Sequence, residues 1–237
     1  MFNNSKYGTV LTVILIIAVI AIVGIVCVIG YRMYSAYYVD TGATQAATQF
    51  EQSLQNNIAN GQNVVSGNNI SATDTTKTDI TGVDDTTIAN NGNNNNGNSQ
   101  TTTKYKGFDV VGTIQIPAIN LKYPILGKIT TTSLKTSVVL MYTAQGVNNE
   151  GNTVIMGHNY RNGTMFSNVD KLAKGDLIYI TDTAGRKVKY QIYSIYRASG
   201  SESEYITRNT EGRREISLST CTDDSKARTI VLAREVQ

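Results

Sequence analysis

The sequence predicts an all-β C-terminal domain, built as a closed eight-stranded barrel with one or two short helices and preceded by an N-terminal transmembrane helix. Three observations predict this arrangement. A long apolar run lies near the N-terminus, an Asn- and Thr-rich segment follows it, and residues 107–237 contain eight short strand-like segments. We expect a stub at 1–9, a membrane anchor at 10–31, a flexible stalk at 32–106 and a catalytic domain at 107–237.

The apolar run Val10–Ile29 contains no charged residue. Twenty residues in a helix span about 30 Å, which matches the hydrocarbon core of a bilayer. Tyr31, Tyr34, Tyr37 and Tyr38 follow, as is typical of the aromatic belt at a membrane interface. A cleaved signal peptide is the alternative, but its apolar region would be shorter and no small-x-small cleavage site is evident. We therefore expect an uncleaved anchor.

The charges that flank the run are nearly balanced, with Lys6 and the α-amino group on one side and Arg32 on the other. The whole candidate folded domain lies on the C-terminal side. We therefore expect a single-pass protein of the cell membrane, with a cytoplasmic N-terminus and an extracellular catalytic domain. Cys27, inside the run, is interpreted as an ordinary lipid-facing apolar residue.

The segment from about residue 40 to 106 is dominated by Asn, Thr, Gly, Ser and Gln. Such a composition buries too little apolar surface to offset its conformational entropy. One part has helical periodicity, because Ala46, Phe50, Leu54 and Ile58 fall on one face at intervals of four. That helix would lie against the membrane or associate with a second copy. We expect the C-terminal domain to fold without residues 1–104.

The C-terminal domain shows repeated alternation of apolar and polar residues, most clearly in KVKYQIYSIY from Lys187. The candidate strands are 110–117, 121–126, 137–142, 152–157, 176–182, 187–198, 214–221 and 227–235. A short helix is expected at 165–175. Eight strands with so few helices favour a barrel or a sandwich, since closure removes exposed strand edges.

The composition excludes several function classes. A net charge of +3 is too small to indicate a nucleic-acid partner, and two cysteines exclude a multi-disulfide scaffold. One histidine excludes a His-rich metal site, and no phosphate-binding loop motif is present. Glu202 and Glu204 are interpreted as solvated acids, so we expect no metal and no cofactor.

The remaining reactive side chains are Cys221, at the end of a strand, and Arg228, at the start of the next. If the two strands form an antiparallel hairpin, these residues lie side by side. Arg234 would lie six residues, roughly 20 Å, further along the strand. His158 follows the apolar strand TVIM and a glycine, so it lies where a buried strand enters a loop.

A cysteine and a histidine far apart in sequence can meet as a nucleophile and its base, and a nearby cation favours the thiolate. Such a cation also stabilises an oxyanion. A structural cysteine and a surface histidine remain the alternative from spacing alone. A free thiol outside the cell favours reactivity, because thiols there are usually paired in disulfides.

Four segments carry a family resemblance. SLSTC at 217–221 resembles the TLxTC signature of the sortases, membrane-anchored cysteine transpeptidases of mainly Gram-positive bacteria. Residues 111–126, 151–166 and 227–235 resemble the opening strands, the histidine segment and the arginine strand of that family. The four segments occur in order over the C-terminal domain. Ser217 departs from the signature but keeps the hydroxyl group.

The resemblance implies a sortase-type eight-stranded barrel in which His158, Cys221 and Arg228 are catalytic and Thr220 supports the oxyanion or binds substrate. It implies cleavage of a C-terminal LPxTG-like sorting signal of secreted proteins through a thioacyl-enzyme. The acyl group would pass to an amine of a peptidoglycan precursor or a pilin. A cysteine hydrolase with the same site and a non-enzymatic stalked surface protein are the alternatives.

Overall fold

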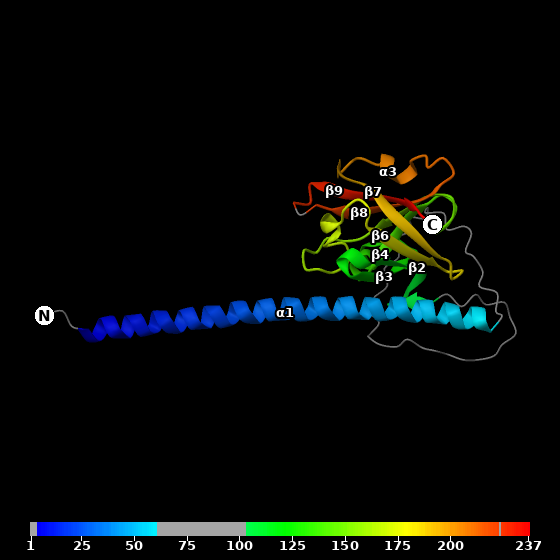
Figure 1. Ribbon diagram of the computed structural model, residues 1–237. Helices are drawn as coiled ribbons and strands as arrows, with labels where there is room; N and C mark the ends of the chain where they lie inside the picture. Colours follow the sequence, from blue (N-terminus) through cyan, green and yellow to red (C-terminus); the bar gives the residue numbers. More distant parts are fainter. Residues whose placement is uncertain (1–3, 61–102, 223) are drawn as a thin grey trace.

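The computed structural model describes residues 4–60, 103–222 and 224–237 of the chain. One long helix runs along a β-barrel and extends far beyond it (Figure 1). Helices are α1 (Asn4–Ala59), α2 (Thr131–Thr136) and α3 (Glu204–Thr207), with 3-10 turns at Pro117–Ile119 and Val169–Lys171. Strands are β1 (Lys104–Tyr105), β2 (Phe108–Ile116), β3 (Leu121–Leu126), β4 (Val138–Thr143), β5 (Gly151–Met156), β6 (Leu177–Asp182), β7 (Lys187–Ser199), β8 (Arg214–Cys221) and β9 (Ala227–Glu235).

Eight strands close into a barrel in the order β2-β3-β4-β5-β8-β9-β7-β6, and β6 pairs back with β2. The short strand β1 adds to the outer edge of β2. The pairs β3–β4 and β5–β8 are parallel, and the remaining pairs are antiparallel. The predicted closed eight-stranded barrel is therefore confirmed.

Two short helices decorate the barrel, as predicted in number but not in place. The segment 165–175 forms only the 3-10 turn at Val169–Lys171. Helix α2 begins instead at a capping box, in which the Thr130 and Ser133 side chains each bond the backbone N–H of the other residue. Such a reciprocal cap satisfies two amide donors that a helix start leaves unpaired. A helix of six residues is too short to show an apolar periodicity in the sequence, so α2 was not predicted.

Apolar residues from all sides of the barrel fill its interior. Ile114, Tyr123, Ile155 and Ile180 are each at most 1% exposed. They belong to one continuous apolar cluster that also contains Ala43 of α1. Part of the helix therefore belongs to the core of the folded domain.

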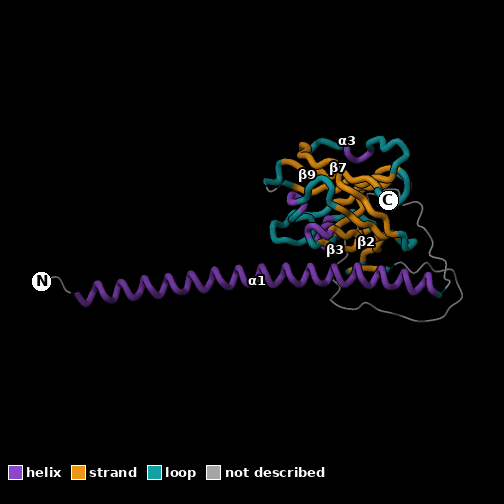
Figure 2. The backbone as a smooth tube through the Cα atoms, in the orientation of Figure 1, coloured by secondary structure: helices purple, strands orange, loops and turns teal. Residues whose placement is uncertain are grey.

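The structure differs from the expected flexible stalk over residues 40–59, which continue α1 and pack on the barrel (Figures 1 and 2). Phe50 and Leu54 lie in a second buried cluster with Val110, Leu126 and Val139 of β2, β3 and β4. Burial of each large side chain contributes about 1.5–3 kcal/mol. Apolar contact therefore holds this part of the chain on the barrel. Residues 61–102 lie outside the described residues.

Polar contacts fix the register of the helix on the barrel. Glu51 forms an ion pair of 2.9 Å with Lys122 and accepts hydrogen bonds from the hydroxyls of Thr113 and Thr181. Burial opposes ionisation of Glu51, but the bond from Thr113 and the charge of Lys122 outweigh it and lower the pKa of this carboxyl. Both ion-pair partners are about four-fifths buried, so solvent screens this pair less than an exposed one.

The N-terminal part of α1 has the length and composition of a membrane span. Val10–Tyr31 is 22 residues long, strongly apolar, and contacts no other described part of the chain. Its apolar side chains, such as Leu11 and Ile20, are largely exposed in the isolated molecule. Uniformly apolar side chains over this length are typical of a helix that spans a bilayer.

Candidate active site

The predicted hairpin of β8 and β9 is present. Its antiparallel register pairs Glu215 with Arg234 at one end and Cys221 with Arg228 at the other. Residues directly opposite each other in a sheet project from the same face. The thiol of Cys221 and the guanidinium of Arg228 therefore leave the same face of the barrel end.

His158 lies beside the end of β8, because β5 and β8 run parallel with Met156 opposite Ser219. Beyond that pair, the Gly157 N–H donates to the Ser219 carbonyl at 3.2 Å. The Asn159 side-chain amide then donates to the Cys221 carbonyl at 3.1 Å. His158 is thus held between two residues that are both bonded to the backbone of the SLSTC segment.

The imidazole of His158 is half-buried and stacks on the ring of Tyr160, with 4.9 Å between ring centroids. Burial lowers the pKa of His158 below the ordinary value of 6.5, and the positive charge of Lys135 on α2 lowers it further. The imidazole is therefore mainly neutral at pH 7, the form that accepts a proton from a thiol.

Cys221 is partly exposed, and both cysteines of the chain, which lie within the described residues, are free thiols. Arg228 is also partly exposed, and none of the described residues forms an ion pair with its guanidinium. A thiol, a neutral imidazole and an unpaired guanidinium at one barrel end can carry out acyl transfer through a thioester.

Two other residues of the SLSTC segment differ sharply in their bonding. Thr220 is 3% exposed, and among the described residues nothing bonds its Oγ1. Ser217 is fully buried, and its hydroxyl donates to the Asn152 side-chain oxygen at 3.0 Å. Asn152 also donates to the carbonyls of Tyr205 and Ile206. The Ser217 hydroxyl therefore helps to anchor α3, whereas the Thr220 hydroxyl is buried without a bonding partner among the described residues.

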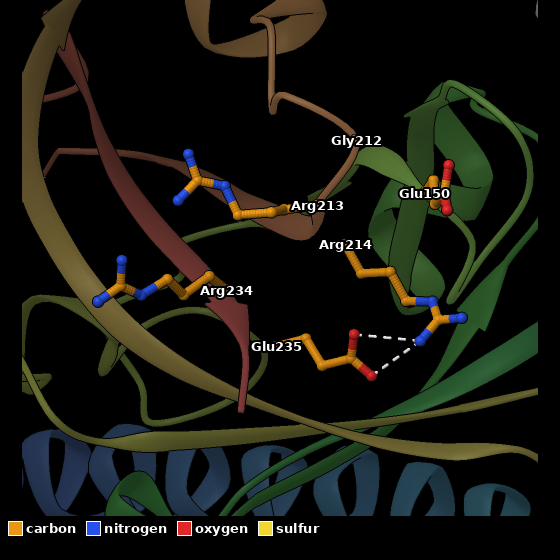
Figure 3. Close-up of a pocket in the computed structure, with 6 residues that line it drawn as sticks. All are labelled: Glu150, Gly212, Arg213, Arg214, Arg234 and Glu235. Atoms are coloured by element: carbon orange, nitrogen blue, oxygen red, sulfur yellow. Dashed lines mark hydrogen bonds and ion pairs between the residues drawn. The ribbon is translucent and has the colours of Figure 1, made fainter. Parts of the chain in front are cut away.

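A separate cavity of about 320 Å³ lies at the other end of β8 and β9 (Figure 3). Its lining residues are Glu150, Gly212, Arg213, Arg214, Arg234 and Glu235. Arg214 bonds both carboxylate oxygens of Glu235, at 2.9 and 3.1 Å. Six residue steps along β9, roughly 20 Å, separate Arg234 from Arg228. The cavity is therefore distinct from the Cys221 site, and Arg234 is not part of that site.

The geometry matches a known family. A family model for the sortase domain matches residues 114–236, slightly more than half of the chain. The chain belongs to the sortase family. The resemblance seen in the four sequence segments is thereby confirmed, and the matched region contains His158, Cys221 and Arg228.

Individual sortases are similar over the same region. "Sortase A" of Bacillus anthracis is 31% identical over 121 residues, which are 49% of this chain and 56% of that protein. "Sortase A" of Streptococcus agalactiae serotype III (strain NEM316) is 27% identical over 142 residues, 57% of this chain and 56% of that protein. The chain thus spans about half the length of the curated relatives it matches.

Solved sortase structures share the barrel. A Clostridium perfringens Sortase D5 transpeptidase superposes with a TM-score of 0.50 at 28% identity, over 54% of this chain and 80% of that one. Sortase A from Corynebacterium diphtheriae superposes with a TM-score of 0.51 at 27% identity, over 55% of this chain and 62% of that one. The matched part corresponds in length to the barrel.

The hairpin pattern predicted that Cys221 and Arg228 lie together, and the resemblance added His158 and Thr220 to the candidate site of this sortase domain. The contacts that support these residues were not predicted. Lys135 lies 23 positions before His158 on a separate helix, so sequence spacing gave no signal of its influence on the imidazole. Asn159 stood directly beside His158, yet its bond to the Cys221 carbonyl depends on the parallel pairing of β5 and β8.

Proposed function

We propose that this sortase is a cysteine transpeptidase that cleaves a C-terminal LPxTG-like sorting signal of secreted proteins and transfers the acyl group to an amine. The observation that carries the proposal is the register of the barrel end. Cys221 is opposite Arg228 on β9, and both neighbours of His158 bond the β8 backbone. The proposed nucleophile and oxyanion donor therefore lie at neighbouring ends of β8 and β9, and the proposed proton carrier follows the end of the adjacent strand β5.

In the first half-reaction, the Cys221 sulfur attacks the carbonyl carbon of the Thr–Gly type bond. The C–N bond breaks, a thioester forms, and the leaving amine takes a proton from His158. The Cys221 thiol supplies the proton that His158 carries, so the first half-reaction is balanced. The low pKa of His158 favours this donation, because a weakly basic imidazolium releases its proton readily.

In the second half-reaction, an amine of a peptidoglycan precursor or a pilin attacks the thioester. His158 accepts the proton that the amine loses, a new amide bond forms and the sulfur of Cys221 is released. Arg228 stabilises the oxyanion in both steps or holds the substrate backbone. The Thr220 hydroxyl, which has no partner among the described residues, supports the oxyanion beside the nucleophile.

The proposal includes a location. Val10–Tyr31 crosses the cell membrane once, with the N-terminus in the cytoplasm and the barrel outside. A thiol transpeptidase placed there meets secreted proteins as they emerge and amines of the growing cell wall. The length and uniform apolarity of the span support the anchor.

The test uses the full chain in detergent micelles with a library of LPxTG-like peptides and a small amine, and the products are read by mass spectrometry. We expect a cleaved peptide joined to the amine. Cys221→Ala is expected to lower turnover at least about a thousandfold, because the nucleophile takes part in both steps. Cys27→Ala, which removes the other cysteine of the chain, is the matched control and should retain full activity.

Two outcomes would contradict the proposal. If the peptide is cleaved but never joined to the amine, at any amine concentration, the protein is a hydrolase and not a transpeptidase. Substantial turnover by Cys221→Ala would exclude the thioacyl mechanism.

A further inference from the structure

One buried hydroxyl joins the long helix to the loop that carries His158. Tyr123 on β3 is 1% exposed, and its hydroxyl donates to the Asp40 carboxylate on α1 at 2.9 Å. The same oxygen accepts from the backbone N–H of Met165 at 3.1 Å. Burial raises the pKa of Tyr123, and the charge of Asp40 raises it further, so the hydroxyl keeps the proton that it donates.

The histidine loop is defined here as residues 158–166, and Met165 lies near its far end. Met165 is buried and holds a left-handed backbone conformation, with φ of +49°, which is uncommon for a residue other than glycine. The backbone of Met165 bridges that of Asn159, and the next N–H, of Phe166, donates to the His158 carbonyl at 3.1 Å. A displacement of the Met165 peptide therefore moves the backbone of His158.

The near end of the same loop is bonded to the nucleophile strand through Gly157 and Asn159. Two sets of hydrogen bonds thus hold the loop, to β8 on one side and to the Tyr123 hydroxyl on the other, while Met165 and Phe166 are buried in the core. Loss of the bond to Tyr123 leaves the bonds to β8 and the core contacts in place. The imidazole would then keep its neighbourhood but be less firmly oriented.

We propose that Tyr123 is a positioning residue for His158 and that Asp40 on the anchor helix completes this connection. The proposal rests on the function proposed above, because it assigns His158 a role in the reaction. It makes residue 40, which lies outside the region matched to the sortase family model, part of the active-site support.

The experiment compares Tyr123→Phe with the unaltered full chain in detergent micelles. We expect kcat to fall about tenfold, because small errors in the placement of a catalytic group are costly. KM should stay within about twofold, since no group that binds substrate is removed. Glu51→Gln is the matched control, because it weakens the same helix–barrel contact at Lys122, Thr113 and Thr181, away from the histidine loop.

A second readout does not depend on the reaction. His158 is the single histidine of the sequence, so histidine labelled with carbon-13 gives one imidazole resonance to follow by NMR. In Tyr123→Phe we expect this resonance to shift and the His158 pKa to rise toward 6.5 as the loop loosens and exposes the ring. Glu51→Gln should leave both unchanged.

Asp40 supplies a second pair of variants in case Tyr123→Phe fails to fold. Asp40→Asn keeps an oxygen acceptor for the Tyr123 hydroxyl and should resemble the unaltered protein, whereas Asp40→Ala should reproduce Tyr123→Phe. The proposal would be overturned if Tyr123→Phe and Asp40→Ala both had the kcat of the unaltered protein and an unchanged His158 resonance. If the unaltered protein transfers no peptide, the proposed function fails, and the NMR comparison still decides whether Tyr123 positions the loop.

Discussion

At the scale of single residues, His158 illustrates how its neighbours set the protonation state of a side chain. The ring is partly withdrawn from water and faces the field of Lys135. Both effects disfavour the imidazolium form. In the proposed mechanism, this neutral imidazole takes the thiol proton of Cys221 and returns a proton to the leaving amine.

We predict that NMR titration of the single histidine gives a pKa below 6.5, and that Lys135→Gln raises it because a repelling charge is removed. Lys174→Gln, an exposed lysine outside the site, is the control and should leave the titration unchanged. A His158 pKa at or above 6.5 in the unaltered protein would contradict the interpretation.

The same shift has a defined effect on stability. Above pH 6.5 the histidine is neutral in both the folded and the unfolded protein, so it contributes no pH dependence. As the pH falls below 6.5, the unfolded chain binds a proton before the folded one does, and the free energy of unfolding decreases. This decrease ends at the folded-state pKa.

At the scale of elements, α1 joins a segment with the length and composition of a membrane span to a part of the barrel core in one continuous helix. Phe50 is 2% exposed and Leu54 is 6% exposed, and both contact strands that lie more than fifty residues later in the chain. Gly185, in the turn between β6 and β7, lies against the end of α1. A Cβ atom added at this position would be 2.7 Å from the side chain of Ile58. The barrel surface thus offers apolar side chains to Phe50 and Leu54, and the absence of a side chain at Gly185 leaves room for Ile58.

We predict that Phe50→Ala lowers the free energy of unfolding by about 3–5 kcal/mol, the usual cost of removing a buried aromatic ring. Gln55→Ala, on the exposed side of the same helix, should change it by less than about 0.5 kcal/mol. Urea unfolding of the full chain, followed by tyrosine fluorescence, makes the comparison. Equal stability of the two variants would show that the helix does not pack on the barrel in solution.

The docked helix argues against the expectation that residues 105–237 form a soluble domain without the preceding chain. Removal of residues 1–60 exposes Val110, Leu126 and Val139, which are otherwise covered by α1. An apolar patch of this kind promotes aggregation. Removal of residues 1–39 leaves the cover in place, so the shorter deletion is the better route to a soluble domain.

At the scale of the whole molecule, the direction of α1 orients the barrel. Asp40 reaches the histidine loop through Tyr123, whereas Ile58 lies against the opposite turn at Gly185. The eighteen residue steps from Asp40 to Ile58 cover about 27 Å of helix. The barrel end that carries the histidine loop is therefore nearer along the helix to Val10–Tyr31 than the Gly185 turn is. Figure 1 shows the N-terminal part of α1 extending beyond the barrel on the side away from the C-terminus.

About 13 Å of helix separates Tyr31 from Asp40, so the proposed span holds the candidate site close to the membrane surface. We predict that fourteen helix-forming residues inserted after Val39, which add about 21 Å, lower transfer from a substrate anchored in the same vesicle at least about tenfold. Transfer from a soluble peptide should change less than about twofold, because the barrel itself is intact.

The control places the same insertion between residues 80 and 81, where it leaves the distance between the span and the barrel unchanged. An equal loss of activity on both substrates, or no loss on either, would show that the length of α1 does not set the reach of the site.

The sequence by itself determined the apolar run at Val10–Ile29, the eight strands and the choice of candidate site residues. Each follows from a local property of the chain: twenty uncharged residues, alternating strands, or a Cys and an Arg on either side of one turn. Such patterns involve residues that are close in sequence, so they can be recognised without knowing which distant residues pack against them. The family signature added the connection between His158 and Cys221.

Only the tertiary structure decided what covers the barrel and what holds the histidine loop. The spacing of Phe50 and Leu54 indicates an apolar helix face, but that face fits a membrane, a second copy or a barrel equally well. Its actual partners, Leu126 and Val139, lie more than seventy residues away. The hydroxyl of Tyr123 likewise acquires its role through partners on two distant segments, which no local pattern specifies.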